Sequence, residues 1–445
     1  MKRWIPFVLV CLFAASSLLT DLNRVGMQWD ESYYVTAAKQ FHDGTWTDPC
    51  WDENDDLYPR PVNYEHPPLA KLIISLSTKI AGDDGGFEGC RSDDNRHYKA
   101  FLKDQDDANR VSWRLPAALL SLAGVVFVGL AAGRLLGGPV PATIAAGVMS
   151  FDLLYLGQAR VAILDPYAAA FLALALYAAT FASWKGTWAT IILLSLGFAS
   201  KYTAAFAGPP LLFLHLVLLY RAGELTRRRF DLSLLTFALV PIGILALTYI
   251  PWWILWIPDM GLFGAISHWV KVLAVSVAWG TAGEAPHADA SGPWSWLIVA
   301  KPVWYYTQHR VGGDPNMEWY IYAIANPFIM WTGIGSIGYA LARYKDKLSL
   351  AIGLLPLATF AVFLFISRAT FIFYAVVLSP LFALSIAHMF TRMWASDNVW
   401  QRMAVLVLGA FIVAGFTWYK PLIFGEAMTL EGKEALFDIL PWMDP

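Results

Sequence analysis

The sequence predicts an all-α polytopic membrane protein with about eleven transmembrane helices. The chain has 445 residues, of which 57% are hydrophobic and 15% are charged, and its mean hydropathy is +0.49. Soluble domains carry about 25% charged residues, so this composition excludes a soluble globular enzyme. The formal net charge of -2 shows no basic excess, which excludes nucleic acid as a partner.

The predicted spans are apolar windows of about 20 residues, enough for a helix to cross a bilayer. The first begins just after Lys2 and Arg3, and no small-residue cleavage site follows it, so it is interpreted as a retained helix and not as a signal peptide. The windows lie near 4–20, 112–133, 139–158, 161–183, 187–200, 203–220, 232–256, 320–342, 348–366, 370–390 and 402–419.

The orientation follows from the Lys and Arg residues of the short loops, which all fall on one side and mark it as cytoplasmic. An odd number of spans then places the N-terminus in the cytoplasm and the C-terminus outside. We predict a single transmembrane domain over residues 1–445, with two extracytoplasmic loops at 21–111 and 257–319. The residues that set the orientation are Lys2, Arg3, Arg134, Lys185, Arg221, Arg227, Arg228, Arg229, Arg343, Lys345, Lys347, Arg392 and Arg402.

The first extracytoplasmic loop contains two segments with apolar residues at helical spacing. Residues 31–41 and 66–80 are therefore expected to form amphipathic helices that lie flat at the membrane interface. The same loop holds Cys50 and Cys90, two of the three cysteines. An extracytoplasmic loop would let these two pair, and the alternative of two unrelated thiols stays open.

Ionisable residues recur at the outer membrane boundary, where a charge needs a partner or a function. A single cation at this boundary is explained as a snorkelling side chain. For Arg160 and Asp165 the alternative interpretation is that they form one structural ion pair. Several cations beside an acidic pair instead predict an anion site that faces a general base, and the anion carried by a membrane is a lipid phosphate. The residues are Asp30 and Glu31 after the first span, His66 and Lys71 in YEHPPLAK, Arg160 and Asp165 in GQARVAILDP, Lys201 in FASKYTAAF, and Arg368 in FISRATFIFY.

These strings, in this order, resemble one known family. The acidic pair, HPPLAK, SWRLPAALLS, QARVAILDP, GFASKYTA, IANPFIMW, SRATFIFY and WYKPLIFG are similar to the protein O-mannosyltransferases, within the GT-C superfamily of polyprenyl-phosphate-sugar-dependent glycosyltransferases. The resemblance runs along nearly the whole chain. Eukaryotic members insert a lumenal β-trefoil domain between spans seven and eight. The connection here is too short for it, which indicates a prokaryotic-type member and leaves the acceptor open.

The resemblance implies a GT-C fold and an inverting transfer of a sugar, usually mannose, from a dolichyl or polyprenyl phosphate to a Ser or Thr hydroxyl outside the cytoplasm. It implies that Asp30 is the base and that Glu31 orients acceptor or donor. The remaining residues divide between the donor phosphate, bound by Arg160, Lys201 and Arg368, and the donor and acceptor pocket, shaped by His66, Lys71 and Asp165. A phosphate leaves as a stable anion, so cations suffice and a second carboxylic acid, which glycoside hydrolysis needs, is not required.

Two alternatives stay open at this stage. A related GT-C enzyme would use the same machinery to glycosylate a lipid or a cell-surface glycan. A transporter or scramblase of lipid-linked sugars would also gather cations at a phosphate, but it would place polar groups near the midplane of the membrane. No metal site is predicted, because no tight ligand spacing such as HExxH occurs; a divalent cation is left open, as is the oligomeric state.

Overall fold

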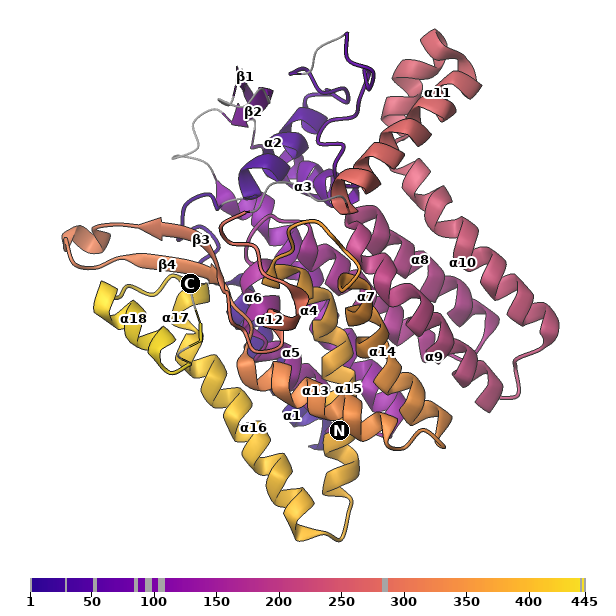
Figure 1. Cartoon of the computed structure of the whole chain (residues 1–445), viewed down its shortest axis with the longest axis vertical. Coiled ribbons are helices and arrows are strands. Elements are labelled where there is room, and N and C mark those ends of the chain that lie inside the picture. The colour runs from indigo at the N-terminus through magenta and orange to yellow at the C-terminus, as the bar shows by residue number, and fades with distance from the viewer. Residues whose placement is uncertain are drawn as a thin grey trace.

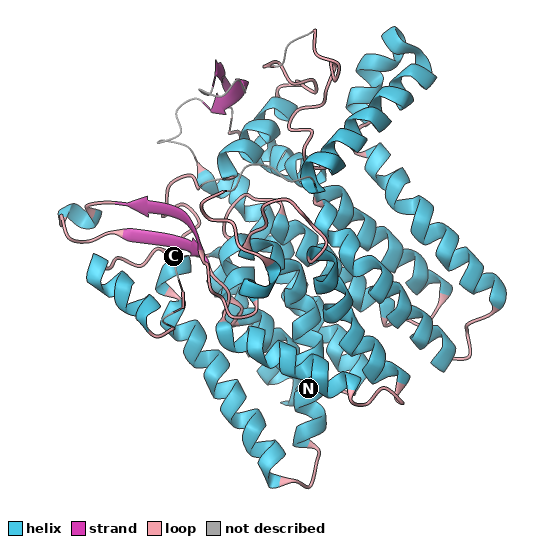
Figure 2. Cartoon of the chain, in the orientation of Figure 1, coloured by secondary structure: helices cyan, strands magenta, loops and turns pink. Residues whose placement is uncertain are grey.

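The computed structural model describes residues 2–28, 30–50, 54–83, 87–92, 98–102, 109–281, 287–440 and 442–443. Helices make up most of it, and two small antiparallel β-hairpins lie at one end (Figure 2). In Figure 1 the N-terminus is marked in the lower part of the helical body, and the C-terminus is marked beside α17, at about mid-height on the left.

The helices and strands, in chain order, have the following bounds. The first half contains η1 (Lys2–Trp4), α1 (Ile5–Leu19), α2 (Glu31–His42), α3 (Leu69–Ile80), β1 (Phe87–Ser92), β2 (Tyr98–Leu102), α4 (Arg110–Leu136), α5 (Pro139–Ser150), α6 (Leu153–Ala159), α7 (Asp165–Ala179), α8 (Trp184–Ser200), η2 (Tyr202–Ala207) and α9 (Gly208–Arg221). The second half contains α10 (Arg227–Leu247), α11 (Ile250–Thr281), α12 (Pro293–Trp296), β3 (Val303–Gln308), η3 (Val311–Gly313), β4 (Trp319–Ala323), α13 (Pro327–Leu341), α14 (Lys347–Phe363), η4 (Ile372–Leu378), α15 (Ser379–Trp394), α16 (Val399–Tyr419), α17 (Pro421–Phe424) and α18 (Leu430–Asp438).

The helices confirm an integral membrane protein but not the count of eleven spans. Among the described residues, seven helices are long and apolar enough to cross a bilayer, or eight if the bent pair α5 and α6 is one span. Other predicted spans form helices too short for that test; α7, for example, has 15 residues and α13 has 15. Helix α7 is buried along most of its length inside the protein.

The core is built from α4, α5, α7, α8 and α15, which pack against one another in the centre of the body (Figure 1). Small residues let these helices approach closely, as is usual where lipid removes a hydrophobic driving force between helices. Gly129 of α4 is one such contact, because a Cβ there would lie 2.9 Å from the carbonyl oxygen of Ala142 on α5. This close packing fixes the helix ends that carry the candidate site.

The predicted span at 139–158 is broken into α5 and α6, which meet at 64°. Asp152 causes the break, because its side chain accepts hydrogen bonds from the backbone N–H groups of Leu154 and Tyr155, at 3.0 and 3.3 Å, and so starts a new helix. The short helix α6 therefore ends inside the body, where residue 160 and the start of α7 follow.

The elements at the end opposite the N-terminus come from the two predicted loops. Helices α2 and α3 form at the two predicted amphipathic segments, although the second begins at Leu69 and not at His66; their place at a membrane interface stays a prediction. The loop predicted at 257–319 is largely structured. Its first part belongs to α11, which changes direction at Gly261 (φ 70°), and the hairpin of β3 and β4 follows.

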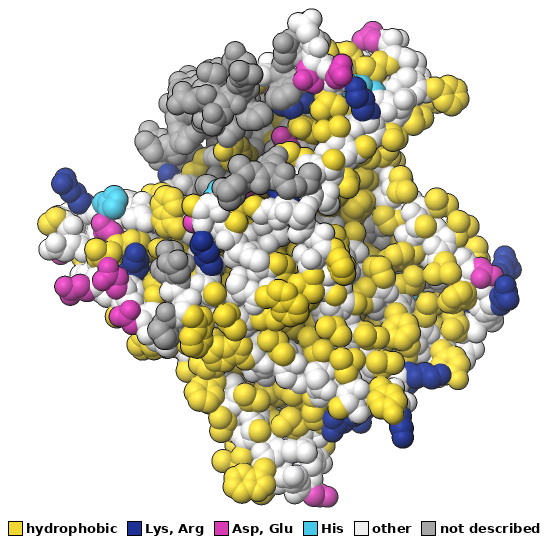
Figure 3. Space-filling model, in the orientation of Figure 1, with side chains coloured by type: hydrophobic (Ala, Val, Ile, Leu, Met, Phe, Trp, Pro, Cys, Tyr) yellow, Lys and Arg dark blue, Asp and Glu magenta, His cyan; other side chains and the backbone are white. Residues whose placement is uncertain are grey.

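Figure 3 shows how hydrophobic and charged side chains are distributed over one face of the molecule. Hydrophobic side chains cover the middle of the visible face, and Lys and Arg side chains gather along its lower and right edges. At that end Asp346 lies 3.6 Å from Arg221 and 3.1 Å from Arg392, so the ends of α9 and α15 meet there.

Candidate active site

Asp30 occupies the N-cap position of α2, in the segment that joins α1 to α2. An Asp at this position usually turns its carboxylate back onto the free N–H groups of the first helical turn. The Asp30 side chain makes no such bond, and within the residues that the structure describes its carboxylate accepts no hydrogen bond. The carboxylate is partly buried and keeps its oxygens available, as a general base requires.

Electrostatics at Asp30 suit proton transfer. The pKa of Asp30 is raised from 3.8 to about 6, chiefly because the carboxylate is buried. Positive charge on Lys201 and Arg368 lowers the pKa, whereas the negative charge of Asp165 raises it. The balance leaves the group mostly ionised at neutral pH and still basic enough to take a proton from a bound hydroxyl.

Lys201 and Asp165 form a buried ion pair beside this carboxylate. Asp165 is the first residue of α7, and Lys201 follows the last residue of α8 with an extended backbone, so the two helix ends bring the pair together. The Lys201 ammonium also lies 4.9 Å from the ring centre of Tyr374. The Oδ1 atom of Asp165 is buried and has no hydrogen-bond partner among the described residues.

Arg368, in the loop between α14 and η4, is the second cation of the site. Its guanidinium lies 3.5 Å from the ring centre of Trp279 and makes one long hydrogen bond of 3.4 Å to the Trp279 carbonyl. No carboxylate is paired with Arg368 in the described part of the chain. Most of its donors are therefore available to an anionic ligand.

His66 lies between the rings of Tyr34 and Trp279, with ring centres 5.7 and 5.9 Å away. The pKa of His66 is well below its usual value because the ring is buried and because Lys201, Lys71 and Arg368 add positive charge. The imidazole is neutral at physiological pH and sits in an electropositive region that favours an anion.

Lys71 does not face the same space. Its ammonium donates to the carbonyls of Asn63 and His66 at 2.7 and 2.9 Å, and to Oδ1 of Asn63 at 3.1 Å. It therefore shapes the pocket only indirectly, by holding the turn that carries His66.

Glu31, predicted to orient a substrate, is fully buried in a structural ion pair. Its carboxylate accepts two hydrogen bonds from Arg114, at 2.7 and 2.6 Å, and one each from the backbone N–H groups of Gln28 and Ala162. These four donors occupy both carboxylate oxygens. In the structure Glu31 therefore stabilises the segment around the site, and its carboxylate does not lie on the open face of the site.

Arg160 is also engaged elsewhere. Its guanidinium donates to the carbonyls of Ser17 and Thr20 at the end of α1, at 2.5 and 2.9 Å, and lies 4.6 Å from the ring centre of Phe424. These two bonds use only the Nη1 group of Arg160, so its binding of the donor phosphate stays a prediction.

Three tyrosines complete the site, and the sequence did not single them out. Tyr34 comes from α2, Tyr305 from β3 and Tyr374 from η4, and each is influenced by the charges of both Asp30 and Asp165. The pKa of Tyr34 and that of Tyr305 are raised, first by burial and then by these carboxylates. Tyrosine is common at membrane boundaries, so nothing in the local pattern distinguished these three from anchoring residues.

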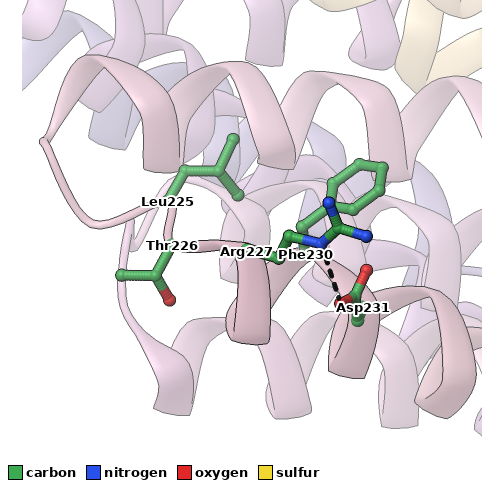
Figure 4. A pocket seen from close by; sticks show the side chains of 5 residues that line it. All are labelled: Leu225, Thr226, Arg227, Phe230 and Asp231. Carbon is green, nitrogen blue, oxygen red and sulfur yellow. Dashed lines mark ion pairs between the residues drawn. The ribbon is translucent and has the colours of Figure 1, made fainter.

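Two other features do not form a second candidate. The hollow at the start of α10, lined by Leu225, Thr226, Arg227, Phe230 and Asp231 (Figure 4), holds only an exposed ion pair of Arg227 and Asp231 at 3.7 Å. In addition, the described residues contain no group of three His, Cys, Asp or Glu side chains placed to hold a metal ion.

Residues 63–260 match the family described as dolichyl-phosphate-mannose-protein mannosyltransferase. A polyprenol-phosphate-mannose–protein mannosyltransferase from Corynebacterium glutamicum is 22% identical, over 98% of this chain and 92% of the relative. The chain is similar in sequence to the protein O-mannosyltransferases.

Solved structures place the chain in the GT-C fold. The Saccharomyces cerevisiae protein O-mannosyltransferase Pmt1-Pmt2 complex bound to the sugar donor matches with a TM-score of 0.72 at 12% identity, over 98% of this chain and 92% of that chain. ArnT from Cupriavidus metallidurans bound to undecaprenyl phosphate matches with a TM-score of 0.52 at 13% identity, over 95% and 76%.

Proposed function

We propose that the protein transfers mannose from a polyprenyl or dolichyl phosphate to Ser or Thr hydroxyls of proteins, with inversion at the sugar carbon. The observation that carries the proposal is the open carboxylate of Asp30 beside Lys201 and Arg368, in a chain related to protein O-mannosyltransferases. A base next to cations is what a glycosyl transfer with a phosphate leaving group requires.

In the proposed reaction the acceptor hydroxyl gives its proton to Asp30 while its oxygen attacks the anomeric carbon of mannose. The bond from that carbon to the phosphate oxygen breaks, and both bonding electrons leave with the polyprenyl phosphate. Arg368 binds the departing phosphate, because its guanidinium has unused donors and delocalised charge. Lys201 adds positive charge, reduced by its pairing with Asp165.

We assign the remaining predicted residues to positioning. Glu31 and Arg114 hold the start of α2 so that Asp30 faces the cations. His66 contributes a neutral hydrogen-bonding ring, and Lys71 holds its turn in place. Asp165 keeps Lys201 in the site and has one carboxylate oxygen available for a sugar hydroxyl.

We further propose that the site faces the outside of the cell membrane. The basic ends of α9 and α15 mark the opposite side as cytoplasmic under the positive-inside rule. Cys50, in the loop between α2 and α3, is disulfide-bonded whereas Cys11 of α1 is free. A disulfide favours an oxidising compartment for that loop, although the side chain of Cys90 lies outside the described residues.

The test is transfer of radiolabelled mannose from dolichyl phosphate mannose to a Ser/Thr-rich peptide by the purified protein. Label in the peptide supports the proposal. Consumption of the donor only when membrane lipids or glycans are supplied would contradict the protein acceptor and favour the related lipid or glycan transferases.

A further inference from the structure

Strand β3 runs beside the segment that ends at Asp30. The ring of Tyr306 lies against Gly26, so closely that a Cβ on Gly26 would come within 2.6 Å of the Tyr306 hydroxyl oxygen. Only a residue without a side chain allows this approach. Gly26 precedes Asp30 by four residues, so this contact ties the strand to the segment that carries the base.

A β-bulge directs the neighbouring residue into the site. Trp304 pairs with Tyr322 and Tyr306 pairs with Ile321, so Tyr305 is an extra residue on β3. The buried Tyr305 side chain then lies within the influence of the Asp30 charge. Bulges commonly re-aim a side chain in this way next to active sites.

In the part of the chain that the structure describes, β3 pairs with one strand only, β4. The opposite edge of β4 is engaged, because Glu318 and Met428 exchange two backbone hydrogen bonds, at 2.9 and 3.0 Å. The two-stranded sheet therefore has its available edge on the β3 side, which is a template for a further strand.

The backbone of Thr307 faces that edge. Residues along an antiparallel strand point their N–H and C=O groups alternately to one neighbour and the other. Because Glu318 points to Met428, Trp319 points to β3, and Tyr320 points away from it again. Thr307 stands opposite Tyr320, so its own N–H and C=O point outward.

We propose that the acceptor polypeptide binds in an extended conformation along the outer edge of β3, pairing its backbone with Thr307 and so bringing a Ser or Thr hydroxyl to Asp30. The proposal rests on the function proposed above. Thr307 is about 7 Å along the strand from Tyr305, two residues at the usual rise, so a hydroxyl two or three residues along the added strand reaches the site.

Main-chain pairing gives affinity that does not depend on the acceptor sequence, and side-chain contacts add the preference. Trp304 supplies such a contact, because it is 47% exposed and its indole N–H donates to Oγ1 of Thr307 at 2.8 Å. The ring is thereby held along the edge, where alternate side chains of the acceptor would meet it.

The first experiment uses a series of peptides with one central threonine, each N-methylated at a single backbone amide, and the full-length protein with dolichyl phosphate mannose. If the peptide adds as a strand, methylation lowers kcat/KM about five- to tenfold at every second amide and has little effect at the amides between them. Equal effects at all amides, or none at any, would overturn the proposal.

The second experiment changes the strand itself. Thr307→Pro removes the outward N–H, which the β3–β4 pairing does not use, and proline is tolerated at such edge positions. Thr307→Val loses the same hydroxyl but keeps the N–H, so it is the matched control. Both variants release the Trp304 ring, so the contribution of the N–H is the difference between them. We expect Thr307→Pro to transfer to the peptide about tenfold less than Thr307→Val, and the two variants to transfer equally to N-acetylthreonine amide.

Equal peptide transfer by Thr307→Pro and Thr307→Val, or an equal loss of Thr307→Pro relative to Thr307→Val with both acceptors, would contradict the strand. Failure of the proposed function looks different, because wild-type protein would then label no peptide at all.

Discussion

The guanidinium of Arg114 on α4 binds both carboxylate oxygens of Glu31, the first residue of α2, at 2.7 and 2.6 Å. Arg114 also donates to the carbonyls of Leu22, Val25 and Gly26. One arginine in the membrane body thus orders the connection between α1 and α2, and the position of Asp30 follows from this order.

The first prediction concerns this pair. Glu31→Gln leaves the Arg114 charge buried without its partner, so we expect the free energy of unfolding to fall by about 3 to 5 kcal/mol. The measurement is thermal unfolding of the purified protein. Arg114→Gln should have a similar effect, and the double variant should be more stable than the sum of the two losses implies. Strictly additive losses would show that the two residues do not stabilise each other.

Asp30→Asn should lower mannose transfer by at least about 100-fold, because the amide cannot accept the proton. Its thermal unfolding midpoint at pH 7.5 should not fall, because the substitution removes a buried charge that has no partner among the described residues. Asp21→Asn, which removes an exposed carboxylate from the same segment, is the matched control and should keep wild-type activity. Full activity of the Asp30→Asn variant would contradict the assignment of Asp30 as the base.

The rate should depend on pH through Asp30. Its pKa is raised to about 6, so kcat/KM should fall as the pH drops through that value and the base becomes protonated. The folded state binds this proton more tightly than the unfolded chain. The stability contribution of Asp30 is therefore fully present below its ordinary pKa and is lost as the pH rises through about 6.

Arg368 shifts this profile in a defined direction. Because its positive charge lowers the pKa of Asp30, Arg368→Gln should raise that pKa and move the acid limb of kcat/KM to higher pH. The readout is the midpoint of the acid limb, not its height. A midpoint that stays in place or moves to lower pH would contradict the placement of Arg368 near the base.

Substitutions of the two arginines predicted from the sequence to bind phosphate should affect KM for the donor and the unfolding midpoint differently. Arg368→Ala should raise KM for the donor about tenfold or more without lowering the unfolding midpoint, because its charge-assisted bonds are available to a ligand. Arg160→Ala should lower the unfolding midpoint and leave KM for the donor nearly unchanged, because its bonds go to Ser17 and Thr20. The reverse pattern would restore Arg160 as the phosphate ligand.

The contact between Gly26 and Tyr306 gives a paired prediction. Gly26→Val forces the ring of Tyr306 to move from its place between β3 and the segment that carries Asp30, at a cost of about 1 to 3 kcal/mol, so peptide transfer should fall. Tyr306→Ala in the same protein removes the clash and should restore part of the activity. No rescue by the second substitution would argue that Gly26 acts in some other way.

The sequence was informative where local chemistry has few solutions. Asp30, Asp165, Lys201, Arg368 and His66 were all selected because charged or polar groups at a membrane boundary are costly, and the structure brings all five together. Glu31 and Arg160 were selected by the same rule, and they contact protein groups: Glu31 accepts from Arg114, and Arg160 donates to the last carbonyls of α1. The criterion selects both kinds of residue because it rests only on the free-energy cost of burying a charge. A structural partner in the protein compensates that cost as well as a bound substrate does.

Composition and hydropathy by themselves determined that the chain is a membrane protein, because 57% hydrophobic residues leave too little polar surface for a soluble one. Only the tertiary structure decided which apolar helices are surrounded by protein, and which charges meet a partner from a distant segment. Arg114 illustrates the reason: its contact with Glu31 joins residues 83 positions apart, and no local pattern records that two such positions will touch.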